Sequence, residues 1–164
     1  MAGIARFMHV SARRFREDWR DAFGDAAVPE LPTLPRRATA GSAGYDFFAP
    51  AAFSLAPGAC VRIPTGVRAR IEDGWVLMLF PRSGLGFKYR LQLNNTVGIV
   101  DADYFGARNE GHIFIKLTNA GDRSLSVAAG EAFAQGVFVP FGLTDDDEAR
   151  GERTGGFGST GSNG

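Results

Sequence analysis

The sequence has little cysteine and no excess of charge of either sign. Cys60 is the only cysteine among 164 residues, which excludes an intrachain disulfide and a cysteine cluster for zinc and is typical of a reducing compartment. Lys plus Arg and Asp plus Glu both total 18, so no net field favours nucleic acid or an anionic membrane. No apolar run approaches the ~20 residues that span a bilayer, and MAGIARFMHV lacks the long apolar stretch of a signal peptide. These absences predict a cytoplasmic protein that binds neither nucleic acid nor membrane.

Glycine and phenylalanine, in contrast, are frequent: the chain has 22 Gly, and 14 Phe against 3 Tyr. From residue 43 onward, short runs rich in β-branched and aromatic residues alternate with Gly, Pro and Asn, as in strands joined by turns. In HIFIKLTN, Ile113, Ile115 and Leu117 fall on one face of a strand and the residues between them on the other. The pattern predicts an all-β sandwich or barrel, in one domain of residues 1–143.

One stretch before these strands has a different period. The segment ARRFREDWRDAF places Phe15, Trp19 and Phe23 four residues apart, on one face of a helix. The run ARFMHVS that precedes it alternates as a strand does. We therefore expect an opening strand followed by one short helix over about residues 12–23.

The end of the chain has a composition that does not support a core. Residues 144–164 carry acidic residues, then basic residues and glycine, with little to bury, which predicts a mobile arm. The arm closes with RTGGFGSTGSNG, in which Phe157 is the single large apolar residue. The run is not a phosphate-binding P-loop, because no Lys precedes its Ser and Thr and no helix follows.

The stretch PRSGLGFK, residues 81–88, contains the parts of an anion site. A strand runs into a turn that offers Arg82, the Ser83 hydroxyl and the backbone N–H groups around Gly84 and Gly86. The spacing alone favours the plainer interpretation, a polar turn that carries an exposed arginine.

The stretch NNTVGIVDADYFG, residues 94–106, delivers acidic residues at the end of an apolar strand, a common place for a site. A calcium loop is excluded, because Phe105 and His112 occupy the fifth and twelfth places counted from Asp101. A solvated aspartate is ionised at neutral pH, so Asp101 could accept a proton from water without a histidine. The alternative is a solvated acidic turn that includes Asp103.

Two single polar residues stand in apolar strands. Asp46 lies in GYDFFAP and Gln135 in AFAQGVF, where an unpaired charge or amide is costly, so both need partners. His9 and His112 have no Ser, Cys or carboxylate at a telling spacing, and we assign neither a role in chemistry.

Taken in order, five segments of the chain resemble the five sequence motifs of the trimeric deoxyuridine triphosphatases, over about residues 31–161. The segments are AGYDFFA, PRSGLGFK, NTVGIVDADYFG, GEAFAQGVF and RTGGFGSTG. The opening FMHVS, the short helix and LPTLPRRAT are similar to the branch of that family with an insertion after the first strand. The resemblance implies a jelly-roll-like subunit that forms a homotrimer with shared active sites.

The same resemblance implies an activity and roles for residues. Family members hydrolyse dUTP to dUMP and pyrophosphate, which keeps uracil out of DNA and supplies dUMP for thymidylate synthesis. Asp101 matches the general base for the water that attacks the α-phosphorus, and Tyr104 matches the ring that packs on the deoxyribose and excludes a 2′-hydroxyl. Asn95 matches the position that reads uracil. Asp46 and Gln135 match catalytic positions that organise, through water, a Mg²⁺ ion bound mainly by the triphosphate.

The remaining residues matched to the family's motifs are expected to bind substrate. They are Arg82, Ser83 and Gly84 on the phosphates; Gly98, Ile99 and Val100 as backbone partners of the base; and, from the arm, Arg153, Phe157, Gly158, Ser159 and Thr160. Phe157 is expected to lie on the uracil ring, with the glycines allowing the arm to close as a lid.

Two positions depart from the family pattern. Ala132 stands where many members carry Arg in the fourth motif, so a structural ion pair is missing or supplied elsewhere. In the fifth motif either Arg153 or Arg150 could be the phosphate ligand, and we favour Arg153 because it lies closer to the glycines.

Two other functions remain open from the sequence. A deoxycytidine triphosphate deaminase shares the fold but needs a group that activates water at the base, whereas DADYFG and GGFGSTG favour phosphate chemistry. A non-catalytic relative that binds nucleotide and signals to a partner protein is the second alternative.

Overall fold

The computed structural model describes residues 3–153 and residue 155. The strands are β1 (Ala5–His9), β2 (Arg36–Arg37), β3 (Tyr45–Phe48), β4 (Phe53–Leu55), β5 (Cys60–Pro64), β6 (Val67–Ile71), β7 (Trp75–Pro81), β8 (Leu91–Leu93), β9 (Gly98–Val100), β10 (Phe114–Asn119), β11 (Leu125–Val127) and β12 (Ala132–Pro140). The helices are α1 (Ala12–Phe23), α2 (Ser83–Tyr89) and the 3₁₀ helix η1 (Ala102–Gly106).

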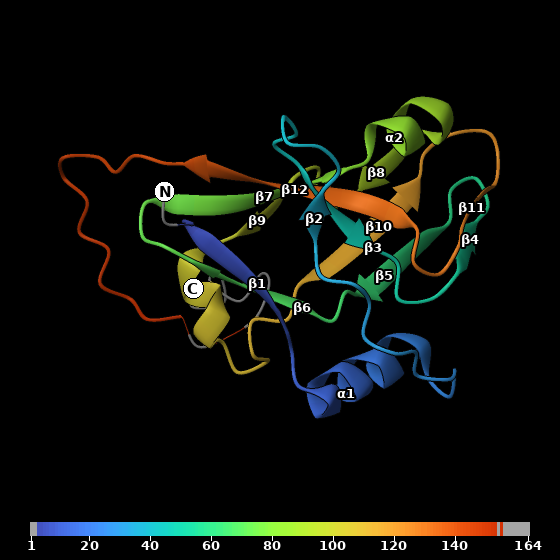
Figure 1. Cartoon of the computed structure of the whole chain (residues 1–164), viewed down its shortest axis with the longest axis horizontal. Helices are drawn as coiled ribbons and strands as arrows, with labels where there is room; N and C mark the ends of the chain where they lie inside the picture. The colour runs from blue at the N-terminus through green and yellow to red at the C-terminus, as the bar shows by residue number, and fades with distance from the viewer. Residues whose placement is uncertain (1–2, 154, 156–164) are drawn as a thin grey trace.

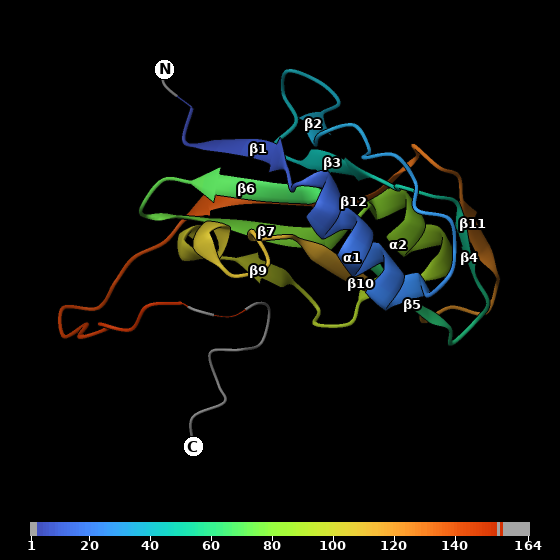
Figure 2. The ribbon, with the colours of Figure 1, turned by 90° about the horizontal axis from the view of Figure 1, so that it is seen from below.

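The strands form layered antiparallel sheets (Figures 1 and 2). The largest sheet has the order β2-β3-β12-β7-β9, and a second has the order β5-β10-β8. Two strand pairs, β1-β6 and β11-β4, complete the sheets of the described chain. The arrangement confirms the predicted all-β, jelly-roll-like class.

The core follows from the alternation seen in the sequence. Ile113, Ile115 and Leu117 are at most 1% exposed, while Lys116 between them faces solvent. Each fully buried aliphatic side chain of this size contributes roughly 1.5–3 kcal/mol to stability. The β10 prediction is therefore confirmed, and its apolar face joins the central cluster that includes Phe47 and Phe133.

The helix predicted before the strands is α1. Its N-cap is Ser11, whose hydroxyl accepts a hydrogen bond from the Arg14 N–H at 3.1 Å, and Gly24 ends it with φ near 61°. Phe15 and Trp19 are buried and form, with Val10, a second small core that lies beside β5. The apolar stripe thus attaches α1 to the sheets.

The sequence did not predict α2. We expected residues 81–88 to run from a strand into a turn, but Ser83–Tyr89 is helical. The helix carries two glycines and no fully buried side chain, and only Leu85 and Tyr89 pack partly against the core. Phe87 is 91% exposed, so the stretch shows too little apolar periodicity to predict a helix. Among the described residues, no helix is long and apolar enough to cross a membrane.

Candidate active site

The carboxylates of Asp101 and Asp103 lie where β9 passes into η1. Val100, the last residue of β9, is buried, and Asp101 follows it in an extended conformation as the N-cap of η1. The Asp101 side chain makes no capping bond to η1, and about half of its surface is exposed. The end of a buried strand therefore presents this carboxylate outward, where a ligand can reach it.

Arg153 of the arm contacts both carboxylates. Its Nη2 donates to Asp101 Oδ2 at 2.6 Å and its Nε donates to Asp103 Oδ1 at 2.8 Å. The guanidinium carbon lies 5.8 Å from the centre of the Tyr104 ring. Figure 1 shows the arm leaving β12 and turning back toward the yellow η1. Arg150, in contrast, donates to the neighbouring carbonyl of Ala149.

Tyr104 is fixed from inside the protein. Its side chain is 2% exposed; its hydroxyl donates to the His112 carbonyl at 2.5 Å and accepts from Asn109 Nδ2 at 2.8 Å. Burial is the main cause that raises the pKa of the Tyr104 hydroxyl. The hydroxyl is thus held as a neutral donor, and the ring has a fixed depth below the η1 surface.

Asp46, Gln135 and Arg82 gather at the other end of the large sheet. Gln135 of β12 pairs in register with Asp46 on β3 and with Phe80 on β7. Arg82 Nε lies 3.3 Å from Asp46 Oδ1, and Gln135 Nε2 donates to the Pro81 carbonyl at 3.2 Å. Both polar groups have the partners that we expected.

Gly44 leaves space for the Gln135 side chain of this cluster, because a Cβ at position 44 would collide with the Gln135 amide oxygen. Ser83 and Gly84, the first residues of α2, are exposed beside Arg82. The first, second and fourth motifs thus meet in one polar corner, which we call the α2 corner: Asp46, Arg82, Ser83, Gly84 and Gln135.

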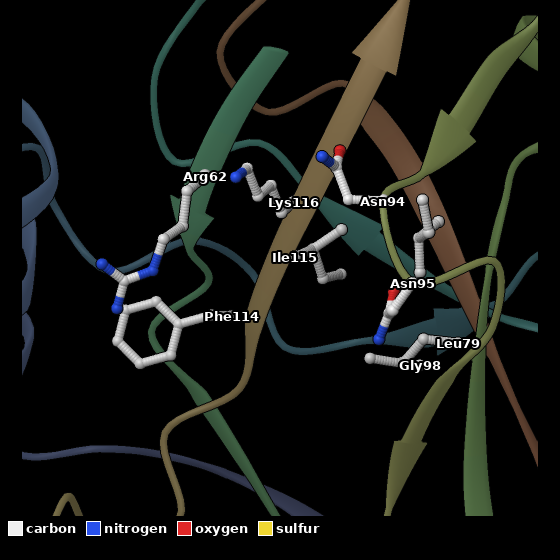
Figure 3. Close-up of a pocket in the computed structure, with 9 residues that line it drawn as sticks. Arg62, Leu79, Asn94, Asn95, Gly98, Phe114, Ile115 and Lys116 are labelled. Atoms are coloured by element: carbon white, nitrogen blue, oxygen red, sulfur yellow. The ribbon is translucent and has the colours of Figure 1, made fainter. Parts of the chain in front are cut away.

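A cavity of about 240 Å³ lies beside the β8–β9 turn (Figure 3). Asn95 and Gly98 line one side, and Arg62, Phe114 and Lys116 line the other. A cavity of roughly 150 Å³ can hold a benzene ring, so this one has room for a single pyrimidine base.

The two residues that follow Gly98 in β9 differ in their exposure to solvent. Ile99 is 45% exposed, whereas Val100 is buried and pairs with Leu77 of β7. Of the three backbone positions expected to contact a base, Gly98 is the one that lines the cavity.

The predicted residues fall into two groups at opposite ends of β7. Leu77 pairs with Val100, which sets Asp101 beside Val76, whereas Arg82 directly follows Pro81 at the far end of the strand. Six residue steps of extended strand, from Val76 to Arg82, separate these ends by about 20 Å. Figures 1 and 2 both show η1 and α2 toward opposite ends of the molecule. One chain therefore does not bring Asp101 next to the α2 corner.

The structure also shows contacts that the sequence did not predict. Asp103 is a second acceptor for Arg153, and Asp18 of α1 lies 2.6 Å from Nδ1 of the buried His112. Asp18 and His112 are 94 residues apart, so no spacing signal could have paired them. Phe157, Gly158, Ser159 and Thr160 lie outside the described residues.

The described part of the chain contains no group of three or more His, Cys, Asp or Glu side chains arranged to hold a metal ion. Asp46 and Gln135 nevertheless supply oxygen atoms at the α2 corner, and the Asp46 side chain is 17% exposed. Oxygen is the ligand that Mg²⁺ takes in proteins, where the ion commonly keeps several waters and binds substrate phosphates. The corner therefore fits contact with a hydrated ion through water.

Comparison with known proteins identifies the family. The dUTPase family model matches residues 32–161. The chain belongs to the dUTPase family. It is 46% identical over 131 residues to the deoxyuridine 5′-triphosphate nucleotidohydrolase of Lactococcus lactis subsp. lactis, which covers 78% of this chain and 87% of the relative. The enzyme of the same name from Enterobacter sp. strain 638 is 41% identical over 145 residues, 84% of this chain and 92% of the relative.

Solved dUTPase structures have the same fold. The dUTPase of Streptococcus mutans is 37% identical, with a TM-score of 0.64 over 85% of this chain and 98% of that one. The dUTPase of Staphylococcus bacteriophage 80alpha, 21% identical, superposes with a TM-score of 0.65 over 92% of this chain and 98% of that one. The resemblance read from the five motifs is thus confirmed for the family and the fold.

Proposed function

We propose that this protein hydrolyses dUTP to dUMP and pyrophosphate. The observation that carries the proposal is the family match over residues 32–161, with relatives named deoxyuridine 5′-triphosphate nucleotidohydrolase at 46% and 41% identity. Asp101, Asn95 and Arg82 are the residues to which we assign, on the basis of this match, the general base, the recognition of uracil and the binding of phosphate. The catalytic domain is residues 1–143, and residues 144–164 form an arm. We place the protein in the cytoplasm, since its one cysteine, Cys60, is exposed and unpaired.

Asp101 acts as the general base. Its exposed carboxylate accepts a proton from water, whose oxygen forms a bond to the α-phosphorus. The bond between the α-phosphorus and the oxygen bridging to the β-phosphorus breaks, and pyrophosphate leaves. Proton transfer of this kind contributes typically 10²–10⁴-fold to rate.

Base and sugar are selected on the same strand. The cavity beside Asn95 and Gly98 receives uracil, with backbone groups of the β9 strand completing the hydrogen bonds. The Tyr104 ring packs against the deoxyribose and leaves no space for a 2′-hydroxyl. A site that hydrogen-bonds one base rejects others strongly, because the wrong base leaves buried polar groups unpaired.

The α2 corner binds the phosphates. Arg82 supplies a guanidinium, and Ser83 and Gly84 supply a hydroxyl and a backbone N–H group. Asp46 and Gln135 orient water around a Mg²⁺ ion that is held mainly by the triphosphate. The ion, when bound, offsets negative charge on the phosphates.

We further propose a homotrimer with active sites shared between chains. A nucleotide with its base near Asn95 and its α-phosphate near Asp101 directs its remaining phosphates away from the α2 corner of the same chain, which lies about 20 Å back along β7. A second copy can supply that corner. The proposal thus explains why the two groups of site residues are separate in one chain.

The arm completes the site. Arg153, already paired with Asp101 and Asp103, is the arm's phosphate ligand in preference to Arg150. Phe157 stacks on uracil, and Gly158, Ser159 and Thr160 contact the phosphates. Ordering such a lid costs about 1–2 kcal/mol per residue, so closure requires bound nucleotide. Deletion of residues 152–164 is expected to leave folding intact and to remove most turnover; full activity of the truncated protein would contradict the lid.

One assay separates the candidate functions. Purified protein with Mg²⁺ is given dUTP, UTP, dTTP or dCTP separately, and pyrophosphate and ammonia are measured. Pyrophosphate from dUTP alone supports the proposal. Ammonia from dCTP indicates a deaminase, and binding of dUTP without turnover indicates a regulatory relative.

A further inference from the structure

Helix α1 contacts the segment that follows η1 at two places. At its start, the Ser11 N–H and hydroxyl donate to the two oxygens of Glu110 at 2.8 and 2.7 Å. About two turns further along, Asp18 Oδ2 lies 2.6 Å from His112 Nδ1. The backbone N–H of Ser11 is the main cause that lowers the pKa of Glu110, which keeps this carboxylate ionised. The second half of the loop after η1 is thus attached to α1 at two points.

His112 has one defined hydrogen-bonding state. Its side chain is fully buried, and its Nε2 accepts from the Gly66 backbone N–H at 2.8 Å. Because a backbone N–H can only donate, Nε2 carries no proton, and Nδ1 of the neutral ring donates to Asp18. Burial is the main cause that lowers the His112 pKa, which favours the same neutral state.

His112 is also the anchor of Tyr104. The Tyr104 hydroxyl donates to the His112 backbone carbonyl, and Asn109 of the same loop donates to that hydroxyl. The loop packs closely on η1, because a Cβ at Gly111 would lie 2.6 Å from the Tyr104 carbonyl oxygen. A shift of His112 therefore moves the group that sets the depth of the Tyr104 ring.

We propose that Asp18 of α1 is a positioning residue for sugar selection. Its carboxylate holds the His112 ring, and the His112 carbonyl in turn holds the Tyr104 hydroxyl. The family match begins at residue 32, so the helix that provides Asp18 lies outside the matched residues. The inference rests on the proposed contact between Tyr104 and the deoxyribose.

The size of the expected effect follows from the geometry. A ring that excludes one hydroxyl group must be placed to within a fraction of an ångström, and misplacement by about 1 Å can change rates by roughly 10²-fold. Loss of the Asp18 acceptor leaves the buried His112 Nδ1–H without its partner, so the loop must rearrange. Selectivity against UTP is then expected to fall more than turnover of dUTP.

The test compares kcat/KM for dUTP and for UTP. Asp18→Ala is expected to lower the dUTP-to-UTP ratio by about tenfold or more, while kcat for dUTP changes less. Asp18→Asn keeps an oxygen acceptor for Nδ1–H and is expected to restore most of the ratio. Glu17→Ala is the matched control, because Glu17 is an acid on the same helix whose ion pairs are with Arg13 and Arg14.

The outcomes separate this inference from the proposed function. If the wild-type protein does not hydrolyse dUTP, the proposed function fails. If the wild type discriminates and folded Asp18→Ala keeps the wild-type ratio, the positioning role of Asp18 is overturned. Should Asp18→Ala not fold, Asp18→Leu fills the space without an acceptor for Nδ1–H; an unchanged ratio in that variant overturns the role equally.

Discussion

The two ends of β7 carry different kinds of site. At the η1 end, Tyr104 and His112 are buried, and each is fixed by hydrogen bonds from different elements. At the α2 corner, the Arg82 side chain is 43% exposed and meets a single carboxylate at 3.3 Å. The η1 end therefore has a buried, hydrogen-bonded network beneath its exposed carboxylates, whereas at the α2 corner Arg82 has one carboxylate partner and no such network beneath it among the contacts described.

The difference matches the role that we propose for each end. Telling deoxyribose from ribose, and aligning a water with phosphorus, both depend on fixed distances, which a buried network provides. Holding a flexible triphosphate depends on charge, which a long arginine supplies in several geometries. The comparison teaches that substitutions at the η1 end should affect selectivity and chemistry, whereas those at the α2 corner should affect phosphate binding.

The largest effect is expected at the η1 end, from Asp101→Asn. The amide cannot accept the proton of the attacking water, so kcat should fall roughly 10³-fold. Binding of dUTP should remain, since the cavity and Tyr104 are unchanged. Steady-state turnover and calorimetric titration with a non-hydrolysable analogue measure the two quantities. Turnover at the wild-type rate would exclude Asp101 as the base.

The second prediction tests whether the two ends of β7 serve different active sites. Asp101→Asn and Arg82→Ala subunits, each nearly inactive alone, are mixed, unfolded and refolded together. If each site takes Asp101 from one chain and Arg82 from the next, random assembly should restore about one quarter of wild-type activity. Sites contained within one chain would show no recovery. Each variant refolded alone is the control.

The η1 end also shows where sequence reasoning reaches its limit. Asp101, Tyr104 and Asn95 could be found because one strand and its turns present them within ten residues. Asp18 could not be found, because it comes from a helix 94 residues before its partner and no local pattern connects the two. Contacts over such a separation are set by tertiary packing.

For the strands and the α2 corner, part of the structure could be predicted from the sequence and part could not. Strands such as β10 were predictable, because burial on one face imposes a period of two. Helix α2 was not, because it buries no side chain fully and carries glycines. The cost of an unpaired Asp46 and Gln135 predicted that partners exist, and only the strand register shows that they lie together.

The third prediction concerns Arg153, the arginine of the arm that contacts Asp101 and Asp103 at the η1 end. Arg153→Ala removes the arm's proposed phosphate contact; one hydrogen bond to a charged group contributes about 1.5–3 kcal/mol, so kcat/KM for dUTP should fall roughly 10- to 100-fold. Arg150→Ala is the matched control, because Arg150 contacts a neighbouring backbone carbonyl, and it should stay within about twofold. The reverse order of effects would assign the phosphate contact to Arg150.

The smallest expected effect is on stability, and it arises from the buried histidine of the η1 end. Burial lowers the pKa of His112 in the folded protein below the ordinary value of about 6.5. The unfolded chain therefore binds a proton first as pH falls, and the stabilisation present above pH 6.5 is lost progressively below it. The free energy of unfolding should drop by about 1 kcal/mol between pH 7.5 and 5.5, measured by urea titration at constant protein concentration.

Two variants test whether His112 causes this slope of the free energy of unfolding against pH. His112→Gln should flatten it, because the residue that titrates is gone, whereas His9→Gln should keep it, since His9 is exposed and bonds the Pro32 carbonyl. The window lies above the range in which carboxyl groups titrate, so Glu110 does not contribute. An equal slope in wild type and His112→Gln would mean that the histidine at the centre of the η1 network does not couple proton binding to folding.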